Sequence, residues 1–307
     1  MSQYATHTAV DERIGDRVGD YRIDSLVGVG GMGKVYHATA SDGTPVALKI
    51  VKDDFARDET FKRRFRREAR IAQTVRNPHV IPVLATGEQG GRPYLAAQFI
   101  DGCSLEQKLG REGRLDLPTI VRICAEVADG LQALWAAGMV HRDIKPGNIM
   151  LDLTGKAFIT DFGLAKDNQG SVLTMPGQAL GSLDYMSPEQ IRGEPVTAAA
   201  DIYSLGCVMF ECLHGKPPFA DRQGMRVLWA HLQDEPADPC AGRADVPREF
   251  TAAVKAALRK QPAERPSSSM EYACSLSKAA GIPVMQSTAE WRVDPGQELH
   301  LRGPRTA

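Results

Sequence analysis

The sequence HRDIKPGN occupies residues 141–148, and FITDFG follows at residues 158–163 after a short apolar run and a turn containing Gly155. Asp143 and Asp161 therefore stand on either side of a predicted β-hairpin. Because a hairpin returns the chain to its starting point, this spacing can bring both carboxylates into one cleft. The stretch predicts a loop that carries reactive groups.

Three further blocks accompany this stretch, namely GGMG at 30–33, SPEQ at 187–190 and WAHL at 229–232. The order H-R-D-x-x-x-x-N and then D-F-G resembles the signature of protein kinases. With these blocks, the chain is similar to the bacterial eukaryotic-type (Hanks-type) protein serine/threonine kinases. The resemblance implies an α+β, two-lobed protein kinase fold, with a small antiparallel β-sheet lobe holding one key helix and a larger, mainly α-helical lobe.

The resemblance covers residues 21–280, which we expect to divide into a small lobe at 21–100 and a large lobe at 101–280. Residues 1–20 begin with a polar, aperiodic stretch, which predicts a flexible lead-in. Residues 281–307 have no helical period, so we expect a C-terminal extension that is a flexible tail, a docking strip or a fragment of something longer.

Phosphoryl transfer needs cations against the phosphates and a hydroxyl aimed in line, because negative charge spreads over the transferred group. Asp143 is the candidate base for the substrate hydroxyl, and Lys145 is the candidate partner of the γ-phosphate. Asn148 and Asp161 supply hard oxygen ligands, which suit Mg²⁺ shared with the phosphates of ATP, with Mn²⁺ as an alternative. The resemblance gives His141 a packing role and not that of a base.

Glycines interrupt two alternating, strand-like runs at residues 21–27 and 34–40. A glycine lets backbone N–H groups approach a polyphosphate where a Cβ atom would collide. A dinucleotide-binding fold would place a helix after the glycines, whereas β-branched and aromatic residues follow here, so the pattern favours strand, loop and strand. By resemblance, the residues of this hairpin that contact the nucleotide are Val27, Gly28, Gly30, Gly31, Gly33 and Val35.

A single lysine, Lys49, interrupts an apolar strand, and an interior lysine needs a partner. Downstream, Phe61, Phe65, Glu68 and Ala72 recur at helical spacing, and Glu68 is the only acid on that face. The resemblance implies that Lys49 holds the α- and β-phosphates and pairs with Glu68. The alternative is an ordinary amphipathic helix with Glu68 on its rim.

Residues 80–86 and 92–99, split by a glycine-bearing turn, predict a further hairpin of the small lobe. The segment after this hairpin resembles the hinge that binds adenine through its backbone. The residues that the resemblance places around the base and phosphates, beyond the glycine hairpin, are Ala47, Lys49, Glu68, Ala97, Gln98, Ile100 and Met150. Ala97 is smaller than the residue that kinases usually carry there, which predicts an unfilled space behind the nucleotide. The alternative is that Phe99 or Leu95 leans in and fills it.

The irregular stretch after Asp161 resembles an activation segment. Arg142 precedes the candidate base, and an arginine there normally requires a phosphate on that segment. Thr174 is the expected regulatory site, with Ser171 as a second candidate and incidental modification as the alternative. Ser182 replaces the usual threonine and keeps its hydroxyl, which favours Ser/Thr specificity.

The resemblance also assigns structural roles to three charged residues. Glu189 is expected to pair with Arg265, and Asp201 is expected to hold the backbone of the catalytic loop. On the helix of Glu68, arginines 63, 64, 66 and 67 are candidates to bind a phosphorylated loop or a partner, with a solvated basic face as the alternative.

The composition indicates a chain that binds no nucleic acid, since the formal net charge is −1 over 307 residues. No apolar run approaches eighteen residues and no secretory signal is present, so we expect a cytoplasmic chain without a transmembrane segment. The six cysteines form no C-x-x-C pair, which favours reduced thiols.

The predicted function is transfer of the ATP γ-phosphate to Ser/Thr hydroxyls of proteins, with autophosphorylation of the activation segment. A homodimer through the small lobe is a further candidate interaction. Two other classes are weighed. A catalytically weak scaffold usually lacks one of the reactive residues, all of which are present here. A small-molecule phosphotransferase would lack the segment around Ser182 and Glu189.

Overall fold

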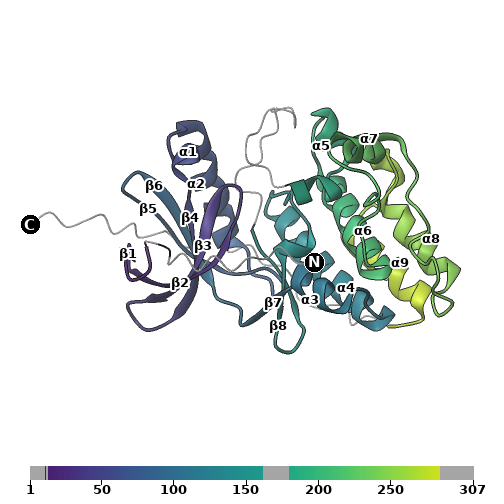
Figure 1. The fold of residues 1–307 in the computed structure, drawn as a ribbon, viewed down its shortest axis with the longest axis horizontal. Helices are drawn as coiled ribbons and strands as arrows, with labels where there is room; N and C mark the ends of the chain where they lie inside the picture. The colour runs from purple at the N-terminus through teal and green to yellow at the C-terminus, as the bar shows by residue number, and fades with distance from the viewer. Residues whose placement is uncertain (1–10, 12, 162–179, 284–307) are drawn as a thin grey trace, which may run out of the picture.

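A computed structural model describes residues 11, 13–161 and 180–283, which form two lobes (Figure 1). The small lobe holds a six-stranded antiparallel sheet in the order β1-β2-β3-β4-β6-β5. Its strands are β1 (Arg17–Val18), β2 (Tyr21–Val29), β3 (Gly33–Ala40), β4 (Pro45–Val51), β5 (Val83–Gln89) and β6 (Arg92–Gln98). The small antiparallel sheet lobe agrees with the expectation from the sequence.

Alternation along the strands gives the small lobe two different faces. Tyr36 and Leu48 are paired across β3 and β4, are fully buried, and belong to a small apolar cluster on one face. Lys49 and Leu95 are paired across β4 and β6 on the opposite face, where Leu95 joins the main core. Because successive side chains of a strand point to opposite faces, Lys49 is directed away from the small cluster.

Helix α2 (Glu59–Thr74) follows the short α1 (Asp53–Ala56). The carboxylate of Asp58 caps its first turn by accepting hydrogen bonds from the backbone N–H groups of Thr60 and Phe61. The helix buries Phe61, Lys62, Phe65, Ala69 and Ala72. The buried stripe therefore passes through Ala69, and Glu68 lies at its edge with intermediate exposure.

The sheet begins earlier than expected. Strand β1, which lies within the predicted flexible lead-in, pairs with β2, and Ile23 N donates a hydrogen bond to Asp16 O at 2.9 Å. The side chain of Gln89 accepts from the N–H of Gly19 and donates to the carbonyl of Arg17. These bonds correct the lead-in prediction for the described residues 13–20, because their backbone groups find partners in the sheet.

Strand β5 begins three residues later than the predicted start at Val80. The segment before it bonds to the large lobe, since Ile81 N donates to Ile159 O (3.0 Å) and Ile159 N donates to His79 O (2.8 Å). Gly130 allows this contact, because an added Cβ would lie 2.9 Å from His79 O. Residues 79–81 precede the lobe boundary expected at residue 100, yet they are hydrogen-bonded to the large lobe.

The large lobe is mainly helical. Its helices are α3 (Leu105–Glu112), α4 (Leu117–Ala136), α5 (Pro188–Arg192), α6 (Ala198–His214), α7 (Met225–Gln233), α8 (Arg248–Ala257) and α9 (Ser269–Ala280), with 3-10 turns η1 (Pro146–Asn148), η3 (Leu180–Tyr185) and η4 (Pro262–Glu264). The large lobe also holds a three-stranded sheet in the order β7-β8-β9; its strands are β7 (Gly102–Ser104), β8 (Ile149–Asp152) and β9 (Ala157–Ile159).

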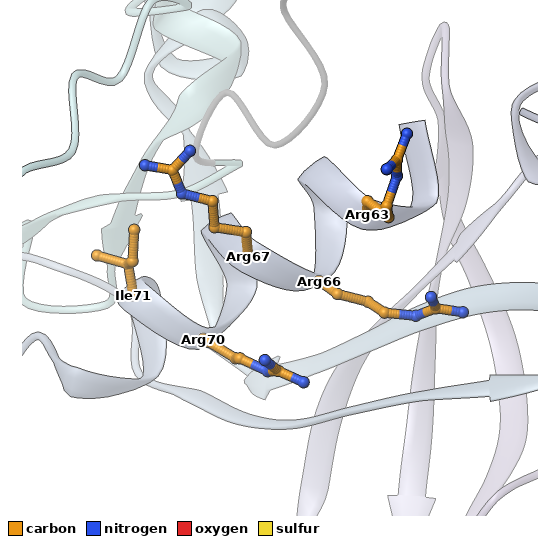
Figure 2. A pocket seen from close by; sticks show the side chains of 5 residues that line it. All are labelled: Arg63, Arg66, Arg67, Arg70 and Ile71. Atoms are coloured by element: carbon orange, nitrogen blue, oxygen red, sulfur yellow. The ribbon is translucent and has the colours of Figure 1, made fainter. Parts of the chain in front are cut away.

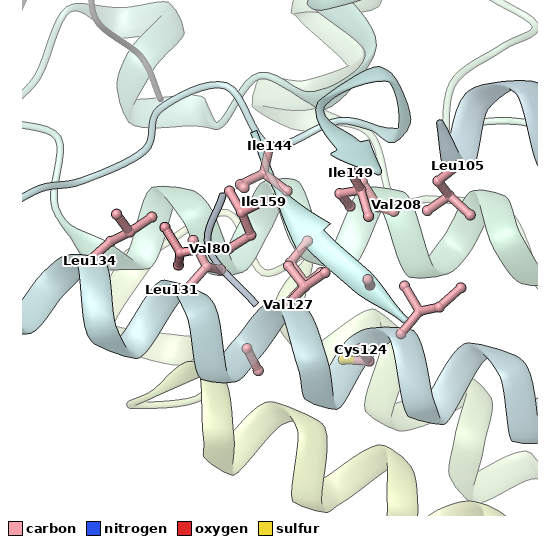
Figure 3. Close-up of a cluster of buried hydrophobic side chains, with 14 of the residues drawn as sticks. Val80, Leu105, Cys124, Val127, Leu131, Leu134, Ile144, Ile149, Ile159 and Val208 are labelled. Carbon is pink, nitrogen blue, oxygen red and sulfur yellow. The ribbon is translucent and has the colours of Figure 1, made fainter. Parts of the chain in front are cut away.

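The core of the large lobe forms between α4 and this small sheet. Figure 3 shows Val127 and Leu131 of α4 lying beneath Ile159 and Val80. These four side chains are at most 3% exposed. The core thus fixes β8 and β9, the two strands that follow residues 141–148, on a rigid helix.

Candidate active site

The backbone of the catalytic loop is held by the carboxylate of Asp201 on α6. Its Oδ1 accepts from Arg142 N (2.7 Å), and its Oδ2 accepts from His141 N (2.9 Å) and from Trp135 Nε1 (2.9 Å). Arg142 has a left-handed backbone with φ of +63°, which an arginine adopts only when its surroundings hold it there. Burial raises the pKa of Asp201, while these donors act to lower it. The structure places Asp201 where the sequence expected it.

His141 is fully buried and both its ring nitrogens have backbone partners. Nδ1 lies 3.2 Å from the N–H of Asp143, and Nε2 lies 2.9 Å from the carbonyl oxygen of Thr160. Since a backbone N–H only donates and a carbonyl only accepts, the ring carries its proton on Nε2. Neither nitrogen is left to take a substrate proton, which supports a structural role.

Asp143, Lys145 and Asn148 lie together at the end of the loop. The Nδ2 of Asn148 donates to the backbone oxygen of Asp143 (2.8 Å) and to its Oδ2 (2.9 Å). The Nζ of Lys145 lies 3.1 Å from the same Oδ2. Asn148 and Lys145 both contact Oδ2 of Asp143, and these two contacts orient the carboxylate of the candidate base.

Lys49 forms an ion pair with Asp161, with 2.6 Å between Nζ and Oδ1. Within the described residues no ion pair joins Lys49 to Glu68, so the pairing expected from the sequence is corrected for this conformation. Asp161 has a left-handed backbone with φ of +53°, and its carboxylate contacts Lys49 of β4, whereas Glu68 sits at the edge of the buried stripe of α2. In this conformation the structure therefore pairs the lysine with the candidate metal ligand.

Asn148 and Asp161 fit a hard cation shared with phosphate. The amide nitrogen of Asn148 is used by Asp143, so the atom it can offer is Oδ1, while the side chain of Asp161 is 40% exposed. Among described residues no group of three His, Cys, Asp or Glu side chains could hold a metal ion by itself. Two oxygen donors plus phosphates are what Mg²⁺ commonly uses.

The glycine hairpin forms the expected strand, loop and strand. Its tip closes with a hydrogen bond from Gly30 N to Gly33 O at 2.8 Å, and Lys52 donates to the carbonyls of Gly30 and Gly31. At Gly33 an added Cβ would lie 2.5 Å from Ile50 O, so only glycine fits beside β4. A side chain at Gly28 would meet nothing within 4 Å, which leaves open space on that strand.

The residues expected around the base lie on the face of the sheet that carries Lys49. Ala47 pairs with Ala97, and Val35 pairs with Lys49, so all four share one face. The positions of the remaining expected residues are as follows: Val27 is 58% exposed beside the hairpin tip, Gln98 ends β6, Ile100 is buried and Met150 lies on β8. The ring of Phe99 stacks edge-on against His37 at 4.6 Å, which argues against its filling the space beside Ala97.

The expected regulatory residues Ser171 and Thr174 lie outside the described residues. Ser182 belongs to the η3 turn, and of this residue only the backbone is described. The carbonyl of Arg142 accepts a 3.0 Å hydrogen bond from Gln190 Nε2, which links the catalytic loop to α5. Sequence reasoning missed Gln190, although Ser187 and Gln190 form a capping box that the S-P-E-Q pattern signals.

A second missed group surrounds Glu211 on α6. Its Oε2 accepts a 2.5 Å hydrogen bond from the hydroxyl of Tyr185, and burial raises its pKa to about 7. Burial also raises the pKa of the adjacent Asp184. Asp184 and Tyr185 belong to η3, so the hydrogen bond from Tyr185 joins this turn to Glu211 of α6. The sequence signal that could have identified this group is Glu211 itself, the one glutamate in an otherwise mostly apolar helix.

Glu189 and Arg265 form the expected buried pair. Arg265 Nη1 lies 2.7 Å from Oε1 and Nη2 lies 2.8 Å from Oε2, and the two side chains are 0% and 2% exposed. The guanidinium also donates to three backbone carbonyls and lies 4.9 Å from the ring of Tyr203. This pair ties α5 to the η4 turn.

Comparisons with known proteins agree with this geometry. Residues 21–276 match the family model described as protein kinase domain. The serine/threonine-protein kinase PknH of Mycobacterium bovis is 37% identical over 284 residues, which are 92% of this chain and 48% of PknH. PknE of Mycobacterium tuberculosis is 38% identical over 257 residues, which are 83% of this chain and 45% of PknE. The chain belongs to the protein kinase family.

Solved structures agree as well. The crystal structure of the Mycobacterium tuberculosis PknI kinase domain is 27% identical, with a TM-score of 0.71, and the match covers 87% of this chain and 99% of that one. The chain spans about half the length of the curated relatives named above. No described helix is long and apolar enough to cross a membrane.

Proposed function

We propose that the chain is an ATP-dependent serine/threonine protein kinase that also phosphorylates its own activation segment. Two observations carry the proposal: Asp143, Lys145 and Asn148 contact one another on one loop, and Lys49 forms an ion pair with Asp161. A scaffold without transfer would need none of this mutual orientation. The relatives named as serine/threonine-protein kinases support the same activity.

The residues of the site divide the work of phosphoryl transfer. Asp143, oriented by Asn148, accepts the proton of the substrate hydroxyl, and Lys145 neutralises charge on the transferred group. Lys49 holds phosphate oxygens once its ammonium leaves Asp161 for Glu68. A bound Mg²⁺, held by Asn148 and Asp161, supplies positive charge against the phosphates.

The transfer-competent arrangement requires an exchange of partners at Lys49. The Lys49 side chain is 20% exposed, and its ammonium lies beside one carboxylate in this conformation. A cation bound by Asp161 would repel the Lys49 ammonium, which lies at Oδ1 of the same carboxylate, so we expect Glu68 on α2 to become the partner of the lysine. Regulation of the protein would then act on the position of α2.

Incubation with Mg-ATP followed by intact mass measurement tests the activity. Wild type is expected to gain phosphate, while Asp143→Asn keeps ATP affinity and loses turnover because only the base is removed. Lys49→Met is expected to lose transfer as well. Autophosphorylation of Asp143→Asn at the wild-type rate would contradict the assignment.

Three finer points belong to the same proposal. Thr174 is the expected activating site, and Thr174→Ala is expected to lower activity toward an added substrate. All six cysteines are free, which supports a reducing, cytoplasmic location. A homodimer through the small lobe stays a prediction, to be checked by light scattering at several concentrations.

A further inference from the structure

The described residues before β2 form a strap on the face of the small sheet opposite Lys49. This N-terminal strap consists of residues 11 and 13–20. Its Val18 is 7% exposed and belongs to the apolar cluster on that face. At one end of the strap, the side chain of Gln89 on β5 bonds to its backbone. At the other end, Asp11 reaches β3.

The carboxylate of Asp11 makes the contact between the strap and β3. Its Oδ2 lies 2.7 Å from Nζ of Lys34, and the hydroxyl of Tyr36 lies 3.2 Å from both carboxylate oxygens. Oδ1 also accepts a 3.1 Å hydrogen bond from Arg13 N. The Asp11 side chain is 6% exposed, and the hydrogen bond from Lys34, more than any other contact, lowers its pKa. A carboxylate so shielded from water needs these donors, which distinguishes the contact from an ordinary surface ion pair.

Lys34 and Tyr36 lie where the glycine hairpin rejoins the sheet. Lys34 directly follows Gly33 on β3. Because side chains alternate along a strand, Lys34 and Tyr36 point to the strap, whereas Val35 between them shares the face of Lys49. The strap therefore holds β3 from behind, on the side away from the nucleotide.

Strand β2, the other half of the hairpin, has less support of its own. Its residues 25–27 and 29 are exposed. Its pairing with β3 also shifts register between Leu26 and Gly28, and such an irregularity disrupts the ladder locally. The position of the hairpin glycines thus depends on β3, which Asp11 holds.

We propose that Asp11 is a positioning residue for nucleotide binding, acting through Lys34 on the strand that carries the glycine hairpin. This role rests on the proposed kinase function, since it requires ATP to bind beneath the hairpin. A hairpin that is held in place beforehand loses less conformational freedom when ATP binds, so the contact raises the affinity for Mg-ATP. By linkage, bound nucleotide stabilises the contact of Asp11 by the same factor.

The reciprocal effect gives a readout on the face opposite the nucleotide. Hydrogen–deuterium exchange is measured on the 307-residue chain with and without Mg²⁺ and β,γ-imido-ATP, which cannot transfer its phosphate. The N–H groups of Ile14 and Asp16 donate to the carbonyls of Asp11 and Arg13 at 3.0 Å. Their exchange is expected to slow about fivefold with the analogue in wild type and to respond little in Asp11→Asn, because the coupling is lost.

Calorimetric titration with the same analogue measures affinity without phosphoryl transfer. Asp11→Asn keeps the size of the side chain and an acceptor for Arg13 but removes the charge opposite Lys34. It is expected to bind the analogue about fivefold more weakly. Lys34→Gln is expected to have the same effect, and the double variant no larger one, because both changes break a single contact.

Glu88→Gln is the matched control, because it also turns a paired carboxylate of the small lobe into an amide. Its partner is Arg66 of α2, whose side chain is labelled in Figure 2, and its strand β5 is separated from β3 by β4 and β6. This variant is expected to bind the analogue like wild type.

The two failures are distinguishable. Wild-type affinity in Asp11→Asn and Lys34→Gln overturns the role of Asp11 alone, as does exchange at Ile14 that ignores the analogue in wild type. An equal loss of affinity in Glu88→Gln overturns it too, since the effect would then follow from any lost carboxylate of the lobe. A wild type that binds no analogue contradicts the kinase function itself, and the role of Asp11 with it.

Discussion

Replacing Asp201 by Asn separates the positioning of the catalytic loop from the stability of the fold. Asp201 accepts three hydrogen bonds, and an amide can keep only those on its oxygen. With that oxygen at the Oδ2 position, the bonds from Trp135 and His141 remain. The amide nitrogen then faces the N–H of Arg142, where two donors oppose each other.

The magnitude follows from that single lost bond. A hydrogen bond to a charged group contributes about 1.5–3 kcal/mol, and removing a buried charge relieves part of its desolvation cost, so unfolding free energy should fall by only about 1–2 kcal/mol. Arg142, released from φ of +63°, gains about 1–2 kcal/mol by relaxing its backbone. The relaxation displaces Asp143, and a shift of about 1 Å at a reacting group can cost about 100-fold in rate.

The assay combines urea unfolding with turnover on a Ser/Thr peptide. Asp201→Asn is expected to lose about 100-fold in kcat while retaining ATP affinity. Trp135→Phe is the matched control, because it removes one bond to the same carboxylate and leaves both loop N–H groups bound. If Asp201→Asn turns over within threefold of wild type, the anchoring role is wrong.

Other substitutions test separate features. Arg265→Met leaves Glu189 charged and buried, and urea unfolding should show a loss of about 3–5 kcal/mol. Burial raises the pKa of Glu211 to about 7, so the folded form binds this proton more tightly than the unfolded form. Stability from this group therefore falls as pH rises from about 4.5 to about 7, by at most about 3 kcal/mol, and Glu211→Gln should flatten that dependence in unfolding measured across this range. Ala97→Met should add about 2 kcal/mol of packing and block a purine analogue with a bulky group, and equal inhibition of wild type and variant would argue against an open space.

The sequence predicts the features that depend on short motifs. Asp201 and the Glu189–Arg265 pair lie where the motifs imply, because each motif carries its own partner geometry. The two faces of the small sheet follow from alternation alone. The helix of Glu68 was also predicted, because its apolar spacing is local.

Other features depend on tertiary contacts that no local pattern contains. The β-branched composition around Val80 predicts a strand of the small lobe. In the structure, residues 79–81 instead form hydrogen bonds with Ile159 of the large lobe. The partner of Lys49 depends on the relative positions of α2, which carries Glu68, and of the segment that carries Asp161. An ammonium group can pair with either carboxylate, so the sequence does not decide between them. Gln190 reaches Arg142 only because α5 returns to the catalytic loop from 48 residues further along the chain.

The bonds that join residues 77–81 to the large lobe turn α2 into a lever. Asn77 Nδ2 donates to Asp129 Oδ2 at 3.1 Å, so the chain is fixed to the large lobe three residues after Thr74 ends the helix. The fulcrum therefore lies near Val75, with Glu68 about 10 Å and Glu59 about 24 Å along the arm. A tilt of about 10° moves Glu68 by about 2 Å and Glu59 by about 4 Å. The N-terminal end of α2 must therefore travel roughly twice as far as the Glu68 carboxylate when that carboxylate moves toward Lys49.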